Sequence, residues 1–179
     1  MRADFMDYGA TLVNLYVKDK NGDVQDVVLG YEDGATYQSR DCYFGTTVGR
    51  NANRIANAKF EIDGVTYQLE VNDNENNLHS GANGVSTRIW DVKELTDSKV
   101  TFVTEDAHLN QGFPGNATIE VTYEVTEENG LSITYKATAD QKTTFNFTNH
   151  TYFNLNGHAS GTILNHTLKL NASYYTPVI

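Results

Sequence analysis

Short runs in which apolar and polar residues alternate recur along this sequence and constrain its fold more than any other feature. In residues 118–125 the apolar side chains stand at every second position, and the pattern returns in 131–137 after the turn 127–130. Successive side chains of a β-strand point to opposite faces, so a period of two predicts half-buried strands. Such runs recur roughly every 8 to 14 residues with turn sequences between them. No stretch has a convincing helical period, so the sequence predicts an all-β fold, an antiparallel β-sandwich.

Turn sequences predict which of these strands are paired. Asp63-Gly64 between two alternating runs is the clearest local signal, because this dipeptide specifies a tight hairpin. The segment 30–41 is polar with no period, so we expect a loop there. A last strand is expected over 164–170, with His166 in phase with the leucines as a core histidine. Three hairpins are expected besides the pair 118–125 and 131–137: 11–17 with 24–29, 60–62 with 65–69, and 89–95 with 100–104.

Length and charge limit the classes of protein and partner. The chain has 179 residues, enough for one domain with a core, and we treat 1–179 as a single β-sandwich domain. Its formal net charge of -10 would repel nucleic acid and an anionic membrane, so neither is an expected partner and a neutral small molecule fits better. Cys42 is the single cysteine, and no run approaches the roughly twenty apolar residues of a membrane span, so a cytoplasmic setting is expected.

The stretch 143–155 contains the strongest candidate for a site. If it is a strand, Phe145, Phe147 and Phe153 share one face. His150 would lie on the opposite face among amides and hydroxyls, where an imidazole, a group that titrates near neutral pH, suits hydrogen bonding to a polar ligand. The alternative is an ordinary solvated strand face. The opposite, polar face would carry Asn146, Thr148, His150, Tyr152 and Asn154.

Two loops supply further candidates. Residues 44–55 alternate two glycines and two arginines, Arg50 and Arg54, with small residues and amides. Phosphate binding has little support, since no known phosphate-loop spacing is present, and an arginine fork for hydroxyls or carboxylates is at least as well supported. His79 lies on irregular backbone in the second loop, where function is often located, although a surface histidine without a role is the alternative.

The polar residues favour sugar chemistry over metal or nucleophile chemistry. Five histidines raise metal binding as a hypothesis, but no two of them have the close spacing of a ligand pair. No serine or cysteine lies in a nucleophile signature. Histidines, arginines and amides in an acidic, aromatic-rich chain suit a sugar, whose hydroxyls need polar partners and whose ring stacks on aromatics. We therefore expect no metal and no cofactor.

Four motifs follow one another along the chain: Gly49-Arg50-Asn51-Ala52-Asn53-Arg54-Ile55, Asn77-Leu78-His79-Ser80-Gly81, Gly112-Phe113-Pro114-Gly115 and Asn149-His150-Thr151-Tyr152-Phe153-Asn154-Leu155. In this order and at this spacing they resemble the aldose 1-epimerase family, the galactose mutarotases. Residues 174–177 continue the match, which covers about Tyr8 to Ile179. The resemblance implies a galactose mutarotase-like supersandwich that interconverts the α and β anomers of an aldohexose such as galactose or glucose.

The resemblance also implies roles for individual residues. In the family, a general base takes the proton of the C1 hydroxyl while a general acid protonates the ring oxygen, and the ring opens to the aldehyde before closing on the other face. By resemblance His150 is the acid, and His79 is a catalytic-site residue that binds near the anomeric centre and ring oxygen. Asn53 and Arg54 would hold sugar hydroxyls, and Tyr152 would line the pocket.

The sequence departs from the family pattern in several places. Ser80 stands where the family usually has glycine, and the strand that normally precedes Asp7–Thr11 is expected to be clipped. The family's base glutamate and a sugar-binding aspartate belong to a second half that cannot be matched here. We therefore expect the N-terminal half of the family's domain, incomplete as a catalyst; a non-catalytic sugar-binding or structural sandwich module is the alternative.

A half-domain has consequences for association. About half of a sandwich would leave strand edges and an apolar face uncovered, and such edges pair readily with another chain. We therefore expect this chain to self-associate or to bind a complementing C-terminal half.

Overall fold

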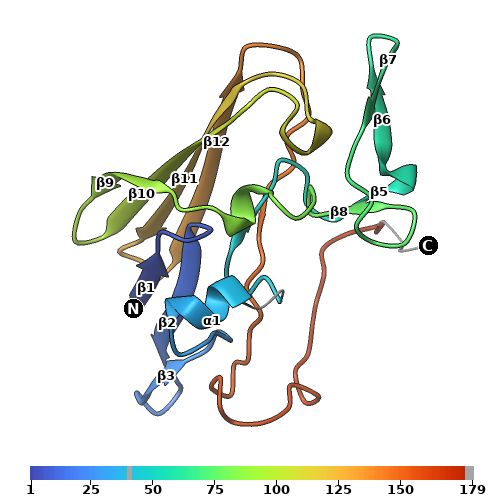
Figure 1. Cartoon of the computed structure of the whole chain (residues 1–179). Helices are drawn as coiled ribbons and strands as arrows, with labels where there is room; N and C mark the ends of the chain where they lie inside the picture. The colour runs from blue at the N-terminus through green and yellow to red at the C-terminus, as the bar shows by residue number, and fades with distance from the viewer. Residues whose placement is uncertain (40–41, 176–179) are drawn as a thin grey trace.

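The computed structural model describes residues 1–39 and 42–175, and within them β-strands dominate (Figure 1). Every pairing between two of the named strands is antiparallel. The predicted all-β antiparallel fold is confirmed. Part of the expected motif 174–177 lies outside the described residues.

The largest element is a four-stranded antiparallel sheet with the order β12-β11-β10-β9. Along β11 the side chains of Ala117, Ile119, Val121 and Tyr123 are buried at every second position. The predicted period of two therefore reports a real buried face, which packs around Trp90 and Phe102. The strands are β9 (Asp91–Leu95), β10 (Lys99–Asp106), β11 (Ala117–Val125) and β12 (Leu131–Ala139).

A three-stranded sheet, β1 (Arg2–Met6), β2 (Thr11–Lys18) and β3 (Val24–Asp26), packs against the first. The ring of Phe5 in β1 lies 4.6 Å from the ring of Tyr123 in β11. The Tyr123 hydroxyl donates to the backbone oxygen of Ala10 at 2.7 Å. The expectation that a strand before Asp7–Thr11 would be missing was wrong, because β1 pairs along β2.

Short paired strands connect these sheets and build the region of the candidate site. β13 pairs with β4, β5 with β8, and β6 with β7. The hairpin predicted at Asp63-Gly64 is confirmed as β6–β7, which projects from the body of the molecule in Figure 1. The bounds are β4 (Thr47–Val48), β5 (Arg54–Ile55), β6 (Lys59–Ile62), β7 (Val65–Gln68), β8 (Asn77–Leu78) and β13 (Thr148–Asn149).

The segment predicted as a loop contains a short α-helix, α1 (Gly34–Ser39). Asp33 precedes it and accepts a hydrogen bond from the backbone N–H of Thr36 at 2.8 Å, a typical way to start a helix. One or two turns are too short to display an apolar period, which explains why the pattern was missed. Single 3-10 turns lie at Ala56–Ala58, Val85–Thr87 and Asn110–Gly112. Within the described ranges, no helix is long and apolar enough to span a membrane.

Two predictions for residues 164–170 were wrong. No strand forms over 164–170, where Leu164 and Leu168 are 89% and 81% exposed, because no neighbouring strand pairs with this segment within the described residues. His166 is not in the core; its Nε2 accepts a hydrogen bond from the backbone of Leu155 at 2.9 Å.

In 143–155 only β13 is a strand, and the three phenylalanines do not share a face. Phe145 and Phe147 pack against the core, whereas Phe153 is half exposed.

Candidate functional site

A groove of about 600 Å³ contains all five residues singled out as site candidates. It lies where β5 and the loop after β8 meet the segment that follows β13. A volume of this order suits a small ligand bound in the open. The lining residues are Ala52, Asn53, Arg54, His79, Asn146, Phe147, Thr148, Asn149, His150, Thr151 and Tyr152.

The pairing of β13 with β4 positions His150. Its backbone N–H donates to Thr46 O at 2.9 Å, and its carbonyl accepts from Gly45 N at 3.3 Å. The Asn149 side chain donates to Gly45 O at 2.7 Å and to the buried Tyr123 hydroxyl at 3.2 Å. The backbone of His150 is therefore held on both sides, and its imidazole is presented to the groove by a rigid support.

His79 is fixed by a reciprocal pair of hydrogen bonds with Asn53. The backbone N–H of His79 donates to Asn53 O at 3.1 Å, and the backbone N–H of Asn53 donates to the Nδ1 of His79 at 3.0 Å. A nitrogen that accepts a hydrogen bond carries no proton, so the neutral ring is protonated on Nε2.

The residue after His79 is Ser80, which stands where the family pattern has glycine. Ser80 has φ 69, a left-handed conformation that glycine adopts most easily. Its hydroxyl accepts from Asn51 N at 2.8 Å and donates to Asn51 O at 3.1 Å. The serine therefore ties the His79 loop to the segment that leads into β5.

The surroundings of His79 favour its uncharged form. Burial is the main cause that lowers its pKa from 6.5 to about 4, and the nearby His150 and Arg54 add to the effect. At neutral pH the ring is therefore neutral, and its Nε2–H is a hydrogen-bond donor. A neutral donor stabilises a ligand oxygen without giving up its proton.

Aromatic rings surround the two imidazoles. The rings of His79 and His150 lie 5.1 Å apart at an angle of 90°. Tyr43 contacts both, with centroid distances of 4.9 Å to His79 and 5.6 Å to His150. Tyr152 lies 5.2 Å from His150. Sequence reasoning selected Tyr152 but missed Tyr43, for which the only signal was an aromatic pair directly before Gly45.

The two arginines of the first motif have different roles. Arg54 lines the groove, where its Nε donates to Asp73 Oδ2 at 2.6 Å and its Nη1 contacts Asn53 Oδ1 at 3.4 Å. No hydrogen bond uses its Nη2 within the described residues, so this edge of the guanidinium can serve a ligand. Asp73, which the sequence analysis did not select, orients the arginine.

Arg50 is fully buried and binds its own chain instead of a ligand. Its Nε donates to Asp106 Oδ2 at 2.5 Å, and its other nitrogens reach backbone oxygens of Pro114 and Gly115, both at 2.7 Å. The sequence predicted an arginine fork for hydroxyls or carboxylates of a ligand, whereas Arg50 reaches an internal carboxylate, that of Asp106, through Nε alone. Arg50 thus stabilises the fold beside the groove.

The described residues contain no cluster of three or more His, Cys, Asp and Glu side chains that could hold a metal ion. The remaining histidines are dispersed: His158 lies 3.3 Å from Asp26, and the Nδ1 of His108 accepts from Gly115 N at 2.9 Å. No carboxylate lines the groove among the residues that the structure describes. The groove therefore offers imidazoles, amides, hydroxyls and a guanidinium as its functional groups.

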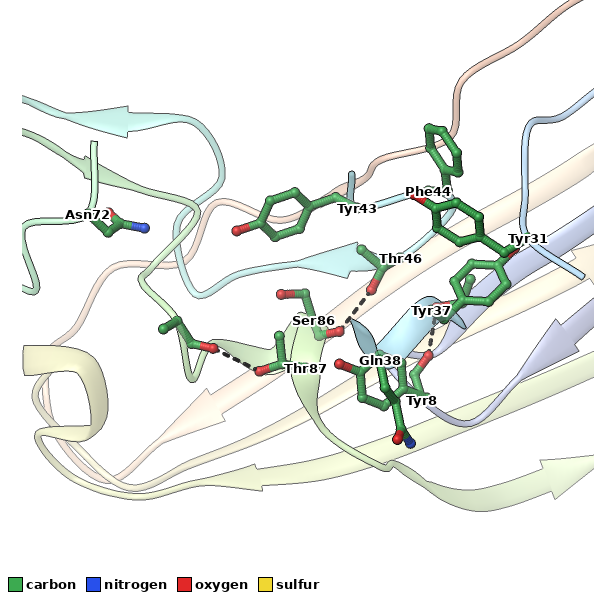
Figure 2. A pocket seen from close by; sticks show the side chains of 12 residues that line it. Tyr8, Tyr31, Tyr37, Gln38, Tyr43, Phe44, Thr46, Asn72, Ser86 and Thr87 are labelled. Atoms are coloured by element: carbon green, nitrogen blue, oxygen red, sulfur yellow. Dashed lines mark hydrogen bonds between the residues drawn. The ribbon is translucent and has the colours of Figure 1, made fainter. Parts of the chain in front are cut away.

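A second cavity of about 290 Å³ lies next to the groove (Figure 2). Aromatic side chains dominate its wall, among them Tyr8, Tyr31 and Tyr37. Tyr43 and Phe44 also line this cavity, and their rings contact His79, His150 and Tyr152 of the groove. These two residues form the partition between the cavities.

Comparison with known proteins gives a consistent result. The family model described as aldose 1-epimerase matches residues 1–179. The chain is 39% identical over 178 residues to an aldose 1-epimerase of Escherichia coli and to a human galactose mutarotase. In each case the match covers 99% of this chain.

Solved structures agree. A homologue of aldose epimerase from C. elegans superposes with a TM-score of 0.83 at 39% identity, over 87% of this chain and 48% of that one. A galactose 1-epimerase from Lactobacillus acidophilus gives a TM-score of 0.75 at 30% identity, over 86% of this chain and 45% of that one. The E. coli and human matches cover 51% and 52% of those proteins, so the chain spans about half the length of the curated relatives it matches.

Proposed function

Because the chain belongs to the aldose 1-epimerase family, we propose that its groove binds an aldohexose such as galactose or glucose and serves the interconversion of the α and β anomers. The observation that carries this proposal is the meeting of His79 and His150, far apart in sequence, at 5.1 Å in one groove. Relatives of about 39% identity are named for this activity.

The two histidines have different tasks in the proposed reaction. His150 is the general acid, which protonates the ring oxygen as the bond between that oxygen and C1 breaks. His79 donates a hydrogen bond from Nε2–H, because its Nδ1 is occupied by Asn53 N–H and its pKa is lowered to about 4. Opening gives the aldehyde, rotation about the C1–C2 bond exposes its other face, and reversal of the proton transfers closes the ring.

The other residues of the groove are proposed to bind the substrate. Arg54 and Asn53 would hold sugar hydroxyls, with Asp73 fixing the guanidinium through its bond to Nε. Tyr152, 45% exposed at the side of the groove, would pack against the apolar face of the pyranose ring.

A base that takes the C1 proton is needed as well, and among the described residues no carboxylate lines the groove. We propose that the 179 residues contain the acid side of the reaction and that a carboxylate from a complementing segment acts as the base. The same observation favours a second candidate function, a sugar-binding module without turnover.

Polarimetry of freshly dissolved α-D-galactose tests the proposal. We expect mutarotation faster than in buffer alone and an enhancement lost in His150→Gln, since general acid catalysis contributes roughly 10²- to 10⁴-fold. The matched control is His158→Gln, a histidine remote from the groove and paired with Asp26, which should keep the wild-type rate. Added formate should raise the wild-type rate more than the His150→Gln rate, because it can replace a carboxylate base.

The two candidate functions give different results. A rate equal to that of buffer, with or without formate, would exclude catalysis by this chain. Galactose binding that persists in calorimetry would then establish the binding module, and loss of binding in Arg54→Met would locate it in the groove.

Self-association is part of the proposal because large apolar side chains are exposed near the end of the described residues. They include Leu164, Leu168, Leu170, Tyr174 and Tyr175. A surface of this kind attracts a partner. Light scattering should therefore find a dimer or larger species, and a monodisperse monomer would contradict this part.

A further inference from the structure

Tyr43 occupies an unusual position between the groove and the aromatic cavity. Its backbone φ is 55, which is uncommon for a bulky side chain, and its carbonyl accepts from Thr46 N at 3.2 Å. Figure 2 shows its ring directed away from that of the neighbouring Phe44. The backbone therefore holds Tyr43 in a conformation in which the rings of Tyr43 and Phe44 point in different directions.

Within the described residues, Tyr43 is the one side chain whose ring contacts both imidazoles of the groove. It meets His79 edge-to-face at 66° and lies tilted by 33° against His150. The imidazoles themselves stand at 90° to each other. Edge-to-face and tilted contacts of this kind are favourable between aromatic rings and help to select one ring orientation.

We propose that Tyr43 is a positioning residue of the site, which holds the imidazoles of His79 and His150 at right angles and shields His79 from water. This inference rests on the proposed function for its meaning in catalysis, but the geometry it describes does not. N–H groups in perpendicular ring planes reach a sugar oxygen from two directions, so one can hold the oxygen while the other transfers a proton.

The electrostatics of His79 agree with such a shield. Burial is the main cause of its low pKa, ahead of the charges of His150 and Arg54. Arg54 is itself paired with Asp73, and among the described residues the ring contacts of His79 are with Tyr43 and His150. Removal of the Tyr43 ring should therefore admit water while His150 and Arg54 stay in place.

Nitrogen-detected NMR of the 179-residue chain, labelled with ¹⁵N-histidine, tests this inference without catalysis. Tyr43→Asn removes the ring and retains a residue that tolerates the left-handed backbone. We expect the pKa of His79 to rise by roughly one unit toward 6.5 in this variant. Tyr43→Phe keeps the ring and should restore the wild-type value. Tyr31→Asn is the matched control, because it removes a ring of the same aromatic cavity that contacts Tyr37 and Phe44.

Each outcome decides the question. An unchanged His79 pKa in Tyr43→Asn, or an equal rise in Tyr31→Asn, overturns the inference. If Tyr43→Asn does not fold, the wild-type chain still decides: nuclear Overhauser contacts from the Tyr43 ring to both imidazoles support the inference, and their absence overturns it. A shifted His79 pKa in a chain without mutarotase activity would leave Tyr43 as the positioning residue while the proposed catalysis fails.

Kinetics supply the second readout. In a chain that accelerates mutarotation, Tyr43→Asn should lower kcat by roughly tenfold through misplacement of the two imidazoles. Tyr43→Phe should recover most of this loss. A tenfold loss that Phe does not recover would point to the hydroxyl and contradict the role of the ring.

Discussion

Replacement of Arg50 by methionine tests how much of the stability beside the groove depends on one buried guanidinium. The side chain is fully buried, and its Nε bonds to the buried Asp106 carboxylate. Nη1 donates to Pro114 O and Thr143 Oγ1, and Nη2 donates to Asp106 O and Gly115 O. All five N–H donors of the arginine are thus used, and the bonds join three segments of the chain.

The expected loss follows from these partners. Removal of one member of a buried ion pair costs about 3–5 kcal/mol, because the other charge is left without compensation. Here Arg88 remains bound to Asp106 Oδ1 at 2.7 Å, which favours the lower end of the range. Orphaned carbonyls add about 1–3 kcal/mol each unless water reaches them. We therefore expect Arg50→Met to lower the free energy of unfolding by at least about 4 kcal/mol, a large share of the roughly 5–15 kcal/mol of a typical domain.

Urea denaturation followed by tryptophan fluorescence measures this quantity. Trp90 is the only tryptophan, is buried in the main core and donates from Nε1 to Val85 O, so its emission reports the folded state. The matched control is Lys142→Met, which breaks the exposed ion pair with Asp63 and should leave the midpoint nearly unchanged. A loss below about 1 kcal/mol in Arg50→Met would refute the reasoning, because the bonds would then contribute no more than a surface pair.

Three further predictions concern single groups. The pKa of His79 is about 4 in the folded chain and 6.5 in the unfolded chain, so the unfolded state binds more protons between these pH values. The free energy of unfolding should therefore fall as the pH drops from 6.5 to 4. A pH series of urea midpoints measures this fall, and the share that belongs to His79 should be missing in His79→Gln. Gly49→Ala would place a Cβ against the ring of Phe147 with too little space between them, so its urea midpoint should fall by an equivalent of about 1–3 kcal/mol, and an unchanged midpoint would contradict the packing. Ser86 has a buried hydroxyl without a hydrogen-bond partner in the described part of the chain, so Ser86→Ala should keep or raise the midpoint, and a loss above about 1 kcal/mol would reveal a missed partner.

Local patterns predicted the parts of the fold that local contacts determine. The hairpins β6–β7 and β11–β12 follow from an alternation and a turn that are contiguous in sequence. The same alternation wrongly predicted a strand over 164–170. A strand also needs a neighbouring strand to pair with, and a period of two does not show whether one exists. The helix α1 was missed because it is short and has no clear period, and the strand β1 was missed because comparison with the family pattern suggested a clipped start.

The candidate site was predictable in its members but not in its geometry. The motifs selected His79, His150, Asn53, Arg54 and Tyr152, and the structure gathers all of them in one groove. Arg50 and Arg54 look equivalent in sequence, and only the position of Asp106 shows that the first is internal. That difference depends on tertiary contacts across more than fifty residues, which a local pattern does not contain.

The order of strands also has a consequence for how the molecule forms. The meander β9–β12 joins neighbours in sequence, so its pairings require only short loop closures. The ladder between β4 and β13, which supports His150, joins Val48 to Thr148 and must close a loop that includes the whole meander. During folding the meander can therefore become protected from hydrogen exchange early, while the groove acquires its shape last and is the first part to be lost when the chain begins to open.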